Sequence, residues 1–133
     1  SGHRFAGMSL LPWRRVRDLP ARRHELVGAV WRAAEAAGEL EVVRYDGYFR
    51  DTGTPAGYLA ANLHAAGDGS LVAPEATVTG HCERSVIGAG AVVRGAVTRC
   101  VLWPGAVVGP DEHLVDAVRV GADLTVSCQP VAG

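Results

Sequence analysis

The sequence contains no lysine: all 13 basic residues are arginine, and 14 acidic residues bring the net charge to −1. This balance excludes a general surface for nucleic acid or for an anionic membrane. No apolar run approaches the ~20 residues of a transmembrane helix, and the first residues lack the pattern of a signal peptide. Cys82, Cys100 and Cys128 are odd in number and lack Cys-x-x-Cys spacing, which argues against a disulfide framework and a zinc site. We therefore expect a soluble protein of a reducing cytoplasm, with no nucleic-acid or membrane partner.

The first half of the chain has the pattern of an α+β segment. Arg4–Pro12 is predicted to be a strand that proline ends. Apolar residues keep a helical period over about Arg22–Ala37, before a glycine stop. A hairpin of Leu40–Tyr45 and Tyr48–Asp51 follows, because Asp46-Gly47 favours a two-residue turn. These few elements would form too small a core to fold independently, so we expect this half to be the last part of a larger sheet.

A run of arginines flanks Asp18-Leu19-Pro20 near the start of the chain. A phosphate-binding patch is one interpretation, but charge runs more commonly face water. We expect a solvated face on two short helical turns. The run consists of Arg14, Arg15, Arg17, Arg22 and Arg23.

The stretch from Asp51 to Pro55 predicts a strand end, a tight turn and the start of a helix. Gly53 lets the backbone bend where a side chain would clash. Thr54 is a good N-cap and Pro55 a good first helical residue, and we expect the helix to run to about Ala66. An acid beside a fresh helix N-terminus suits a metal ion and a phosphate group. Many such acids only hydrogen-bond their own turn, so both roles remain open from these residues alone.

An internal repeat begins after Asp68-Gly69. Three segments align, starting at Ser70, Ser85 and Cys100, and a partial fourth starts at Ala117. The first two are 15 residues long and the third 17, and aliphatic pairs recur about six residues apart within each. Strands this short cannot bury a face alone, but stacked coils bury a continuous core. The repeat therefore predicts a parallel β-helix over residues 70–130.

The repeat also assigns structural roles to residues that could otherwise suggest chemistry. Cys100 occupies the same position as Ser70 and Ser85, so we expect a small stacked side chain rather than a nucleophile. Trp103 precedes Pro104-Gly105 at a predicted corner, where an exposed aromatic side chain suits packing against the first half or against a partner.

Two motifs together resemble a known enzyme family. Tyr48–Pro55, followed by Tyr58-Leu59-x-Ala61-Asn62, resembles the end of the catalytic domain of sugar-1-phosphate nucleotidyltransferases. It looks closest to the mannose-1-phosphate guanylyltransferase-like branch, which usually has isoleucine at Thr52, although thymidylyltransferases for glucose 1-phosphate often have threonine. In the family this aspartate helps to hold the catalytic magnesium, so the resemblance implies Mg²⁺ at Asp51.

The same resemblance implies roles for four more residues. Gly53 and Thr54 would shape the substrate-binding turn beside Asp51, while Phe5 and Gly7 would lie near the sugar. The short coils after Gly69 resemble the left-handed parallel β-helix of hexapeptide-repeat proteins, which many of these enzymes carry after the catalytic domain. The implied fold is therefore the end of a Rossmann-like nucleotidyltransferase domain over residues 1–69, followed by a left-handed β-helix over 70–130.

The resemblance implies nucleotidyl transfer from a nucleoside triphosphate to a sugar 1-phosphate. The family's Gly-rich phosphate loop, second metal-binding acid and sugar-phosphate lysine belong upstream and have no counterpart here. We therefore expect the C-terminal portion of such an enzyme, inactive alone and with no catalytic group of its own. It would associate with the missing N-terminal part or form a homo-oligomer.

Two alternatives remain open at the level of sequence. A hexapeptide-repeat acyltransferase would use a histidine as general base, and His81 and His113 are the candidates. The repeat aligns His81 with Ala96 and Asp111 on an outward turn, and His113 lies in a polar turn, so surface histidines are expected instead. The second alternative is a non-catalytic regulatory or scaffold subunit that kept the fold.

Overall fold

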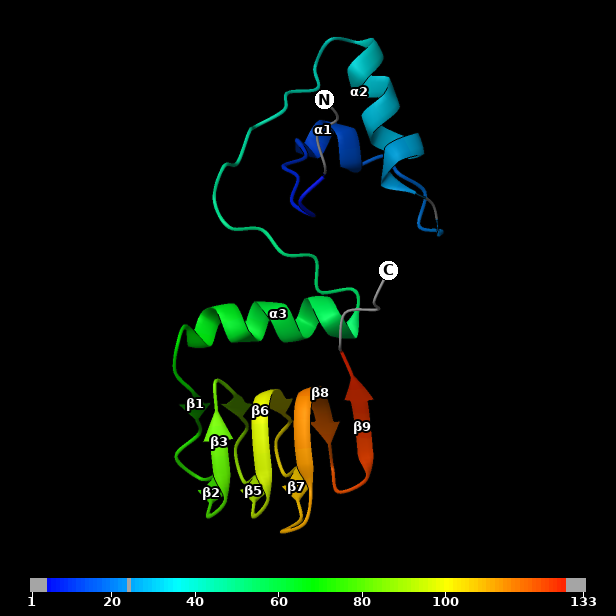
Figure 1. The fold of residues 1–133 in the computed structure, drawn as a ribbon. Helices are drawn as coiled ribbons and strands as arrows, with labels where there is room; N and C mark the ends of the chain where they lie inside the picture. The colour runs from blue at the N-terminus through cyan, green and yellow to red at the C-terminus, as the bar shows by residue number, and fades with distance from the viewer. Residues whose placement is uncertain (1–4, 24, 129–133) are drawn as a thin grey trace. The chain divides into compact units, whose positions relative to one another are not determined.

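A computed structural model describes residues 5–23 and 25–128, which fall into two compact units (Figure 1). The first unit is Ser1–Phe49 and the second is Arg50–Gly133. Among the described residues, no helix is long and apolar enough to cross a membrane.

The first unit consists of short helices. Its elements are α1 (Trp13–Val16), the π-helical η1 (Val27–Trp31) and α2 (Arg32–Ala36). The helix predicted over Arg22–Ala37 is confirmed from Val27 onward, and it stops at Gly38, whose φ is +69°. The ring of Phe5 packs edge-on against Trp31, with centroids 4.7 Å apart at 75°.

The strands predicted in this half are wrong. No described residue before Leu71 belongs to a strand, so neither Arg4–Pro12 nor the hairpin of Leu40–Tyr45 and Tyr48–Asp51 forms; Arg4 itself lies outside the described residues. Val42 and Val43, in the first strand of the expected hairpin, are 67% and 85% exposed, so their apolar side chains have no covering layer here. A lone two-stranded hairpin is at best marginally stable, which explains why none forms here.

The second unit begins with the predicted helix, α3 (Pro55–Ala66). Its start is confirmed in detail, because the Oγ1 of Thr54 accepts a hydrogen bond from the amide of Gly57 over 3.1 Å. Its end is confirmed at Gly67, which has a φ of +64°. Local sequence signals at both ends therefore determine this helix.

The repeat forms a β-solenoid of about three turns. One sheet has the order β1-β4-β6-β8-β9 with β3 also beside β6, and a second has the order β2-β5-β7. All pairs are parallel except β8 with β9. The left hand expected for the solenoid stays a prediction. Its strands are β1 (Leu71–Val72), β2 (Thr77–Val78), β3 (His81–Glu83), β4 (Val86–Ile87), β5 (Val92–Val93), β6 (Ala96–Leu102), β7 (Val107–Val108), β8 (His113–Val120) and β9 (Leu124–Ser127).

Alternating side chains on these strands face the solenoid interior and helix α3. Ile87 pairs with Leu102, and both lie in the interior core at 2% and 1% exposure. Their neighbours Val86 and Val101 belong instead to the cluster around Leu59 of α3. Figure 1 shows α3 lying across the strands on that face. The period of two therefore gives the sheet two apolar faces, one turned to the solenoid interior and one covered by α3.

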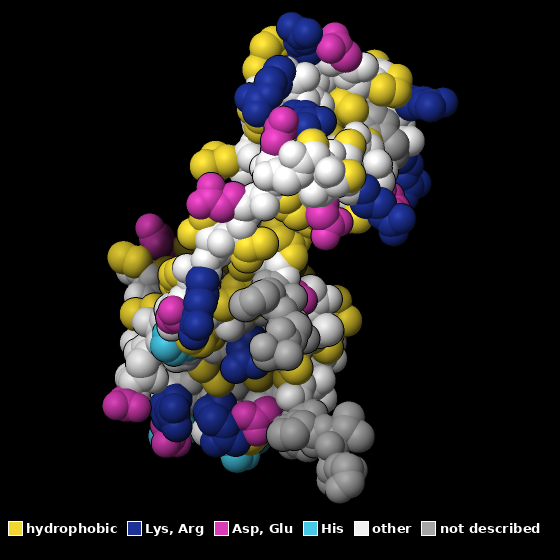
Figure 2. Space-filling model, turned by 90° about the horizontal axis from the view of Figure 1, so that it is seen from above, with side chains coloured by type: hydrophobic (Ala, Val, Ile, Leu, Met, Phe, Trp, Pro, Cys, Tyr) yellow, Lys and Arg dark blue, Asp and Glu magenta, His cyan; other side chains and the backbone are white. Residues whose placement is uncertain are grey.

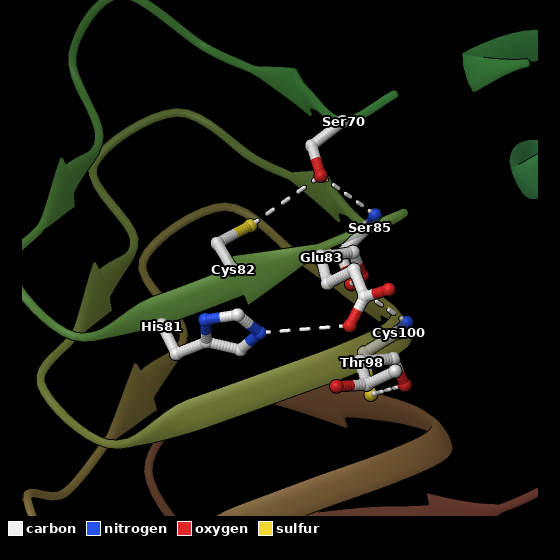
Figure 3. A network of polar contacts seen from close by, with 7 residues as sticks. All are labelled: Ser70, His81, Cys82, Glu83, Ser85, Thr98 and Cys100. Carbon is white, nitrogen blue, oxygen red and sulfur yellow. Dashed lines mark hydrogen bonds and ion pairs between the residues drawn. The ribbon is translucent and has the colours of Figure 1, made fainter. Parts of the chain in front are cut away.

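A ladder of small polar side chains links successive coils (Figure 3). The Oγ of Ser70 accepts from the amide of Ser85, and the Oγ of Ser85 accepts from the amide of Cys100, each over 3.0 Å. The Sγ of Cys100 is turned to the carbonyl of Thr98 at 3.3 Å, and burial raises the pKa of this thiol. The predicted role of Cys100 as a small stacked side chain is confirmed, and a raised pKa disfavours the nucleophilic thiolate.

Three residues with positive φ form one stacked corner of the solenoid. They are Arg84, Arg99 and Asp116, with φ of 45°, 52° and 49°. Arg99 and Asp116 are joined by two parallel hydrogen bonds of 2.7 Å, from Nε and Nη2 to the two carboxylate oxygens. Such forked pairing fixes geometry as well as charge, and here it links two successive coils.

The corner pair predicts a pH dependence of stability. The hydrogen bonds from Arg99 lower the pKa of Asp116, so the pair stabilises the fold above the ordinary aspartate pKa of ~3.9. That contribution is lost as the pH falls through the lowered pKa. Asp116→Asn keeps a residue that tolerates positive φ but removes the charge. We expect a modest loss of stability at neutral pH that disappears in strong acid, measured as urea midpoints. An equal loss at both pH values would contradict this origin.

The partial fourth coil starts as predicted, because Ala117 pairs with Cys100, but it does not continue as a coil. The chain turns at Gly121, with a φ of +61°, and β9 returns antiparallel to β8. The prediction that the partial fourth segment continues as a further parallel coil is therefore wrong. Instead, β9 pairs with the outer edge of β8, which would otherwise be open to another strand.

A buried charge closes the interior at this end. Ile87, Leu102 and Arg119 pair in succession and form an interior column of the solenoid. Arg119, the last of the three, is only 3% exposed. Its guanidinium forms an ion pair with Glu112, whose other oxygen accepts from the amide of Gly109 over 2.6 Å. The Nε of Arg119 has no hydrogen-bond partner among the described residues. An aliphatic column thus ends in an ion pair that separates the core from solvent.

Candidate active-site turn

The Asp51 turn is folded tightly onto the first turn of α3. The Oδ1 of Asp51 accepts from the amide of Gly53 over 2.8 Å, which closes the turn. Gly57 lies beneath it, and a Cβ there would come within 2.2 Å of the Asp51 carbonyl oxygen. Thr54 bridges the two by capping Gly57. The Asp51 side chain is exposed, so its carboxylate is presented to solvent at the head of a helix.

The turn can contribute one metal ligand. No group of three or more His, Cys, Asp or Glu side chains suited to a metal occurs among the described residues. Mg²⁺ usually takes one or two carboxylates together with waters and substrate phosphates. The bond to Gly53 uses only Oδ1 of Asp51, and a carboxylate has a second oxygen to offer. The second carboxylate oxygen of Asp51 is therefore suited to act as one ligand of such an ion.

The structure places the five predicted site residues in different units. Asp51, Gly53 and Thr54 lie together in the second unit, whereas Phe5 and Gly7 belong to the first. Gly7 has a φ of +85°, and a Cβ there would meet no atom within 4 Å. Glycine is thus required at this position by backbone conformation rather than by crowding. The roles of all five residues in binding metal or substrate stay predictions.

Most contacts between α3 and the solenoid were not predicted from the sequence. Leu59 is 5% exposed in a cluster with Val101 and Val118. Tyr58 packs edge-on against Trp103, with ring centroids 6.3 Å apart at 64°. Of the two alternatives left open for Trp103, this contact bears out packing against the first half of the sequence.

The candidate histidines lie on the solenoid surface. His81 pairs with Ala96 as predicted, but Ala96 pairs with His113 and not with Asp111, so that part of the alignment is wrong. The extra two residues of the third segment are accommodated before β8. Both histidines are exposed, and the Nε2 of His81 lies 3.6 Å from Glu83 (Figure 3). The expectation of surface histidines is confirmed, but the expected turns are wrong, because His81 begins β3 and His113 begins β8.

The basic run also behaves as a solvated face. Arg14 and Arg15 both contact Glu39, at 3.2 and 2.8 Å, and the hydrogen bond from Arg15 contributes most to lowering the pKa of that carboxyl group. Figure 2 shows arginine side chains interspersed with acidic ones on the face it presents, rather than gathered in one continuous patch. Mixed charge of this kind is typical of a surface in contact with water.

Comparison with known proteins finds a distant relative. No protein-family profile matches the chain, and no solved structure matches it. The chain is 29% identical over 116 residues to the glucose-1-phosphate adenylyltransferase of Streptomyces avermitilis. The match covers 65% of this chain but only 29% of that protein. The chain is therefore a distant homologue of a sugar-1-phosphate nucleotidyltransferase, as its motifs indicated.

Proposed function

We propose that this chain is the C-terminal portion of a sugar-1-phosphate nucleotidyltransferase. The observation that carries the proposal is an exposed aspartate on a capped turn, in a chain homologous to a glucose-1-phosphate adenylyltransferase. Residues 1–69 would complete a Rossmann-like catalytic domain, and residues 70–130 would form a left-handed β-helix. The intact protein would act in the cytoplasm.

The reaction is an in-line displacement at phosphorus. An oxygen of the sugar 1-phosphate forms a bond to the α-phosphorus of a nucleoside triphosphate, and the bond to the β,γ-diphosphate breaks and releases pyrophosphate. Magnesium, when bound, neutralises charge on the phosphates. Asp51 would supply one carboxylate ligand, while Gly53 and Thr54 hold the turn that presents it. Phe5 and Gly7 would border the sugar.

The upstream part of the enzyme would be the main partner. It would supply the phosphate loop, the second acid and the sugar-phosphate lysine. The solenoid would serve assembly, and the exposed residues of the first coil, Leu71 and Val72 at 49% and 46%, mark its uncapped end. Thr52 does not distinguish the branches of the family, so guanylyl, thymidylyl and adenylyl transfer are all candidate reactions.

Pyrophosphate release tests the proposal. We would assay the complete protein and the 133-residue chain with a panel of nucleoside triphosphates and sugar 1-phosphates in the presence of magnesium. The complete protein should turn over at ordinary enzyme rates of ~1–1000 per second with one pair, and the chain alone should be inactive. A complete protein that is inactive with every pair would overturn the proposal. An active 133-residue chain would show that catalysis does not require the upstream part of the enzyme.

A further inference from the structure

One aromatic corner of the solenoid contacts the first turn of α3. Trp103 lies where β6 ends and is 45% exposed, and its ring meets Tyr58 edge-on at 6.3 Å. The next helical residue, Leu59, is buried against Val101 of the same strand. The second turn adds a hydrogen bond from the Asn62 side chain to the Tyr58 carbonyl over 2.9 Å. Tyr58 is thus held from the solenoid and from its own helix.

The same turn of α3 supports Asp51. The amide of Tyr58 donates to the carbonyl of Thr54 over 2.9 Å, and the amide of Gly57 donates to the Thr54 hydroxyl. Gly57 is also the residue whose missing side chain makes room for the Asp51 carbonyl. A displacement of Tyr58 would therefore move Gly57 and Thr54 with it, and with them the turn that carries Asp51.

We propose that Trp103 and Tyr58 are positioning residues for Asp51, so that the solenoid fixes the turn that presents this carboxylate. The first turn of a helix lacks part of its backbone hydrogen bonds and frays easily. No described residue from Glu39 to Gly53 lies in a helix or strand, so the preceding chain does little to hold the turn. The contact with Trp103 supplies that support. Its catalytic consequence rests on the proposed function, whereas the structural coupling does not.

The coupling is testable in the 133-residue chain by NMR of the Gly53 and Gly57 amides. Both amides donate to the turn, to Asp51 and to Thr54 respectively. Trp103→Ala should shift both signals and lower the hydrogen-exchange protection of Gly57 about tenfold, through local opening. Tyr58→Ala should do the same from the helix side, and Trp103→Phe should restore most of the native spectrum.

A matched control separates positioning from general destabilisation. Val108 is fully buried in the sheet of β2, β5 and β7, so Val108→Ala weakens the solenoid core without touching α3. We expect it to leave both glycine amides in place. Unchanged amides in folded Trp103→Ala and Tyr58→Ala, or equal changes in Val108→Ala, would overturn the inference.

The complete enzyme provides a second readout. Trp103→Ala should lower kcat about tenfold and raise the magnesium needed for half-maximal rate, with the KM for sugar 1-phosphate little changed, because small misplacements of a site cost up to ~100-fold. Trp103→Phe should recover kcat. Unchanged kcat and magnesium requirement in an active enzyme would refute the catalytic consequence. An inactive complete protein would refute the proposed function instead, and the amide measurements would still decide the coupling.

Discussion

Replacing Asp51 with asparagine should lower the turnover of the complete enzyme by at least ~100-fold. Asparagine keeps the side-chain oxygen that accepts from Gly53, and asparagine and aspartate are near-equal in such turns, so the fold of the turn should persist. The substitution removes the negative charge that attracts a hard divalent cation. Binding of base and sugar should change little, so the loss should appear in kcat, measured by pyrophosphate release.

Two controls sharpen the Asp51 experiment. Asp46→Asn removes an exposed acid five positions earlier, at 71% side-chain exposure beside Arg44, and should leave turnover unchanged. Raising magnesium should recover part of the loss in Asp51→Asn but have no such effect in the control. Near-normal turnover of Asp51→Asn at low magnesium would show that Asp51 only closes its own turn.

Removing the carboxylate of Glu112 should destabilise the solenoid strongly. Glu112→Ala would leave Arg119, at 4% side-chain exposure, as a buried charge without its partner. Breaking a buried pair from one side typically costs about 3–5 kcal/mol, and the 41% exposure of Glu112 places our expectation at the lower end of this range. The amide of Gly109 would lose its acceptor as well. Urea unfolding, monitored by circular dichroism, measures the loss.

The double variant Glu112→Ala/Arg119→Leu tests the cause. Leucine would extend the interior column of Ile87 and Leu102, so the double variant should regain most of the stability lost in Glu112→Ala. Glu75→Ala, which removes an exposed acid of the first coil, should have little effect. A Glu112→Ala protein as stable as Glu75→Ala would show that Arg119 finds solvent without its partner.

The solenoid could be predicted from sequence because each coil repeats the same contacts. The ladder of Ser70, Ser85 and Cys100 repeats one position at a period of 15 residues, so alignment alone gives the register. The end of the solenoid was harder to predict. Val118, Val120, Leu124 and Val126 alternate equally well in a further coil or in an antiparallel hairpin, and only the turn at Gly121 distinguishes them.

In the first half of the sequence, by contrast, the predicted strands do not form. Residues 40–49 have strand-like composition, but a strand requires a neighbour, and the described residues provide none. Helix α3 and the Asp51 turn were predictable because their capping hydrogen bonds span only two or three residues. The contact of Tyr58 with Trp103 joins residues far apart in the chain, and no local pattern specifies it.

The single arginine in the interior column constrains how this protein can change in length over evolution. Duplication of a 15-residue period upstream of Arg119 would insert another aliphatic layer and leave the terminal ion pair in place. Duplication of a segment that includes Arg119 would enclose a second charge inside the stack, where its desolvation would oppose folding. We therefore expect natural variants of this solenoid to gain or lose coils on the side of β1 and to conserve the closing segment from Glu112 to β9.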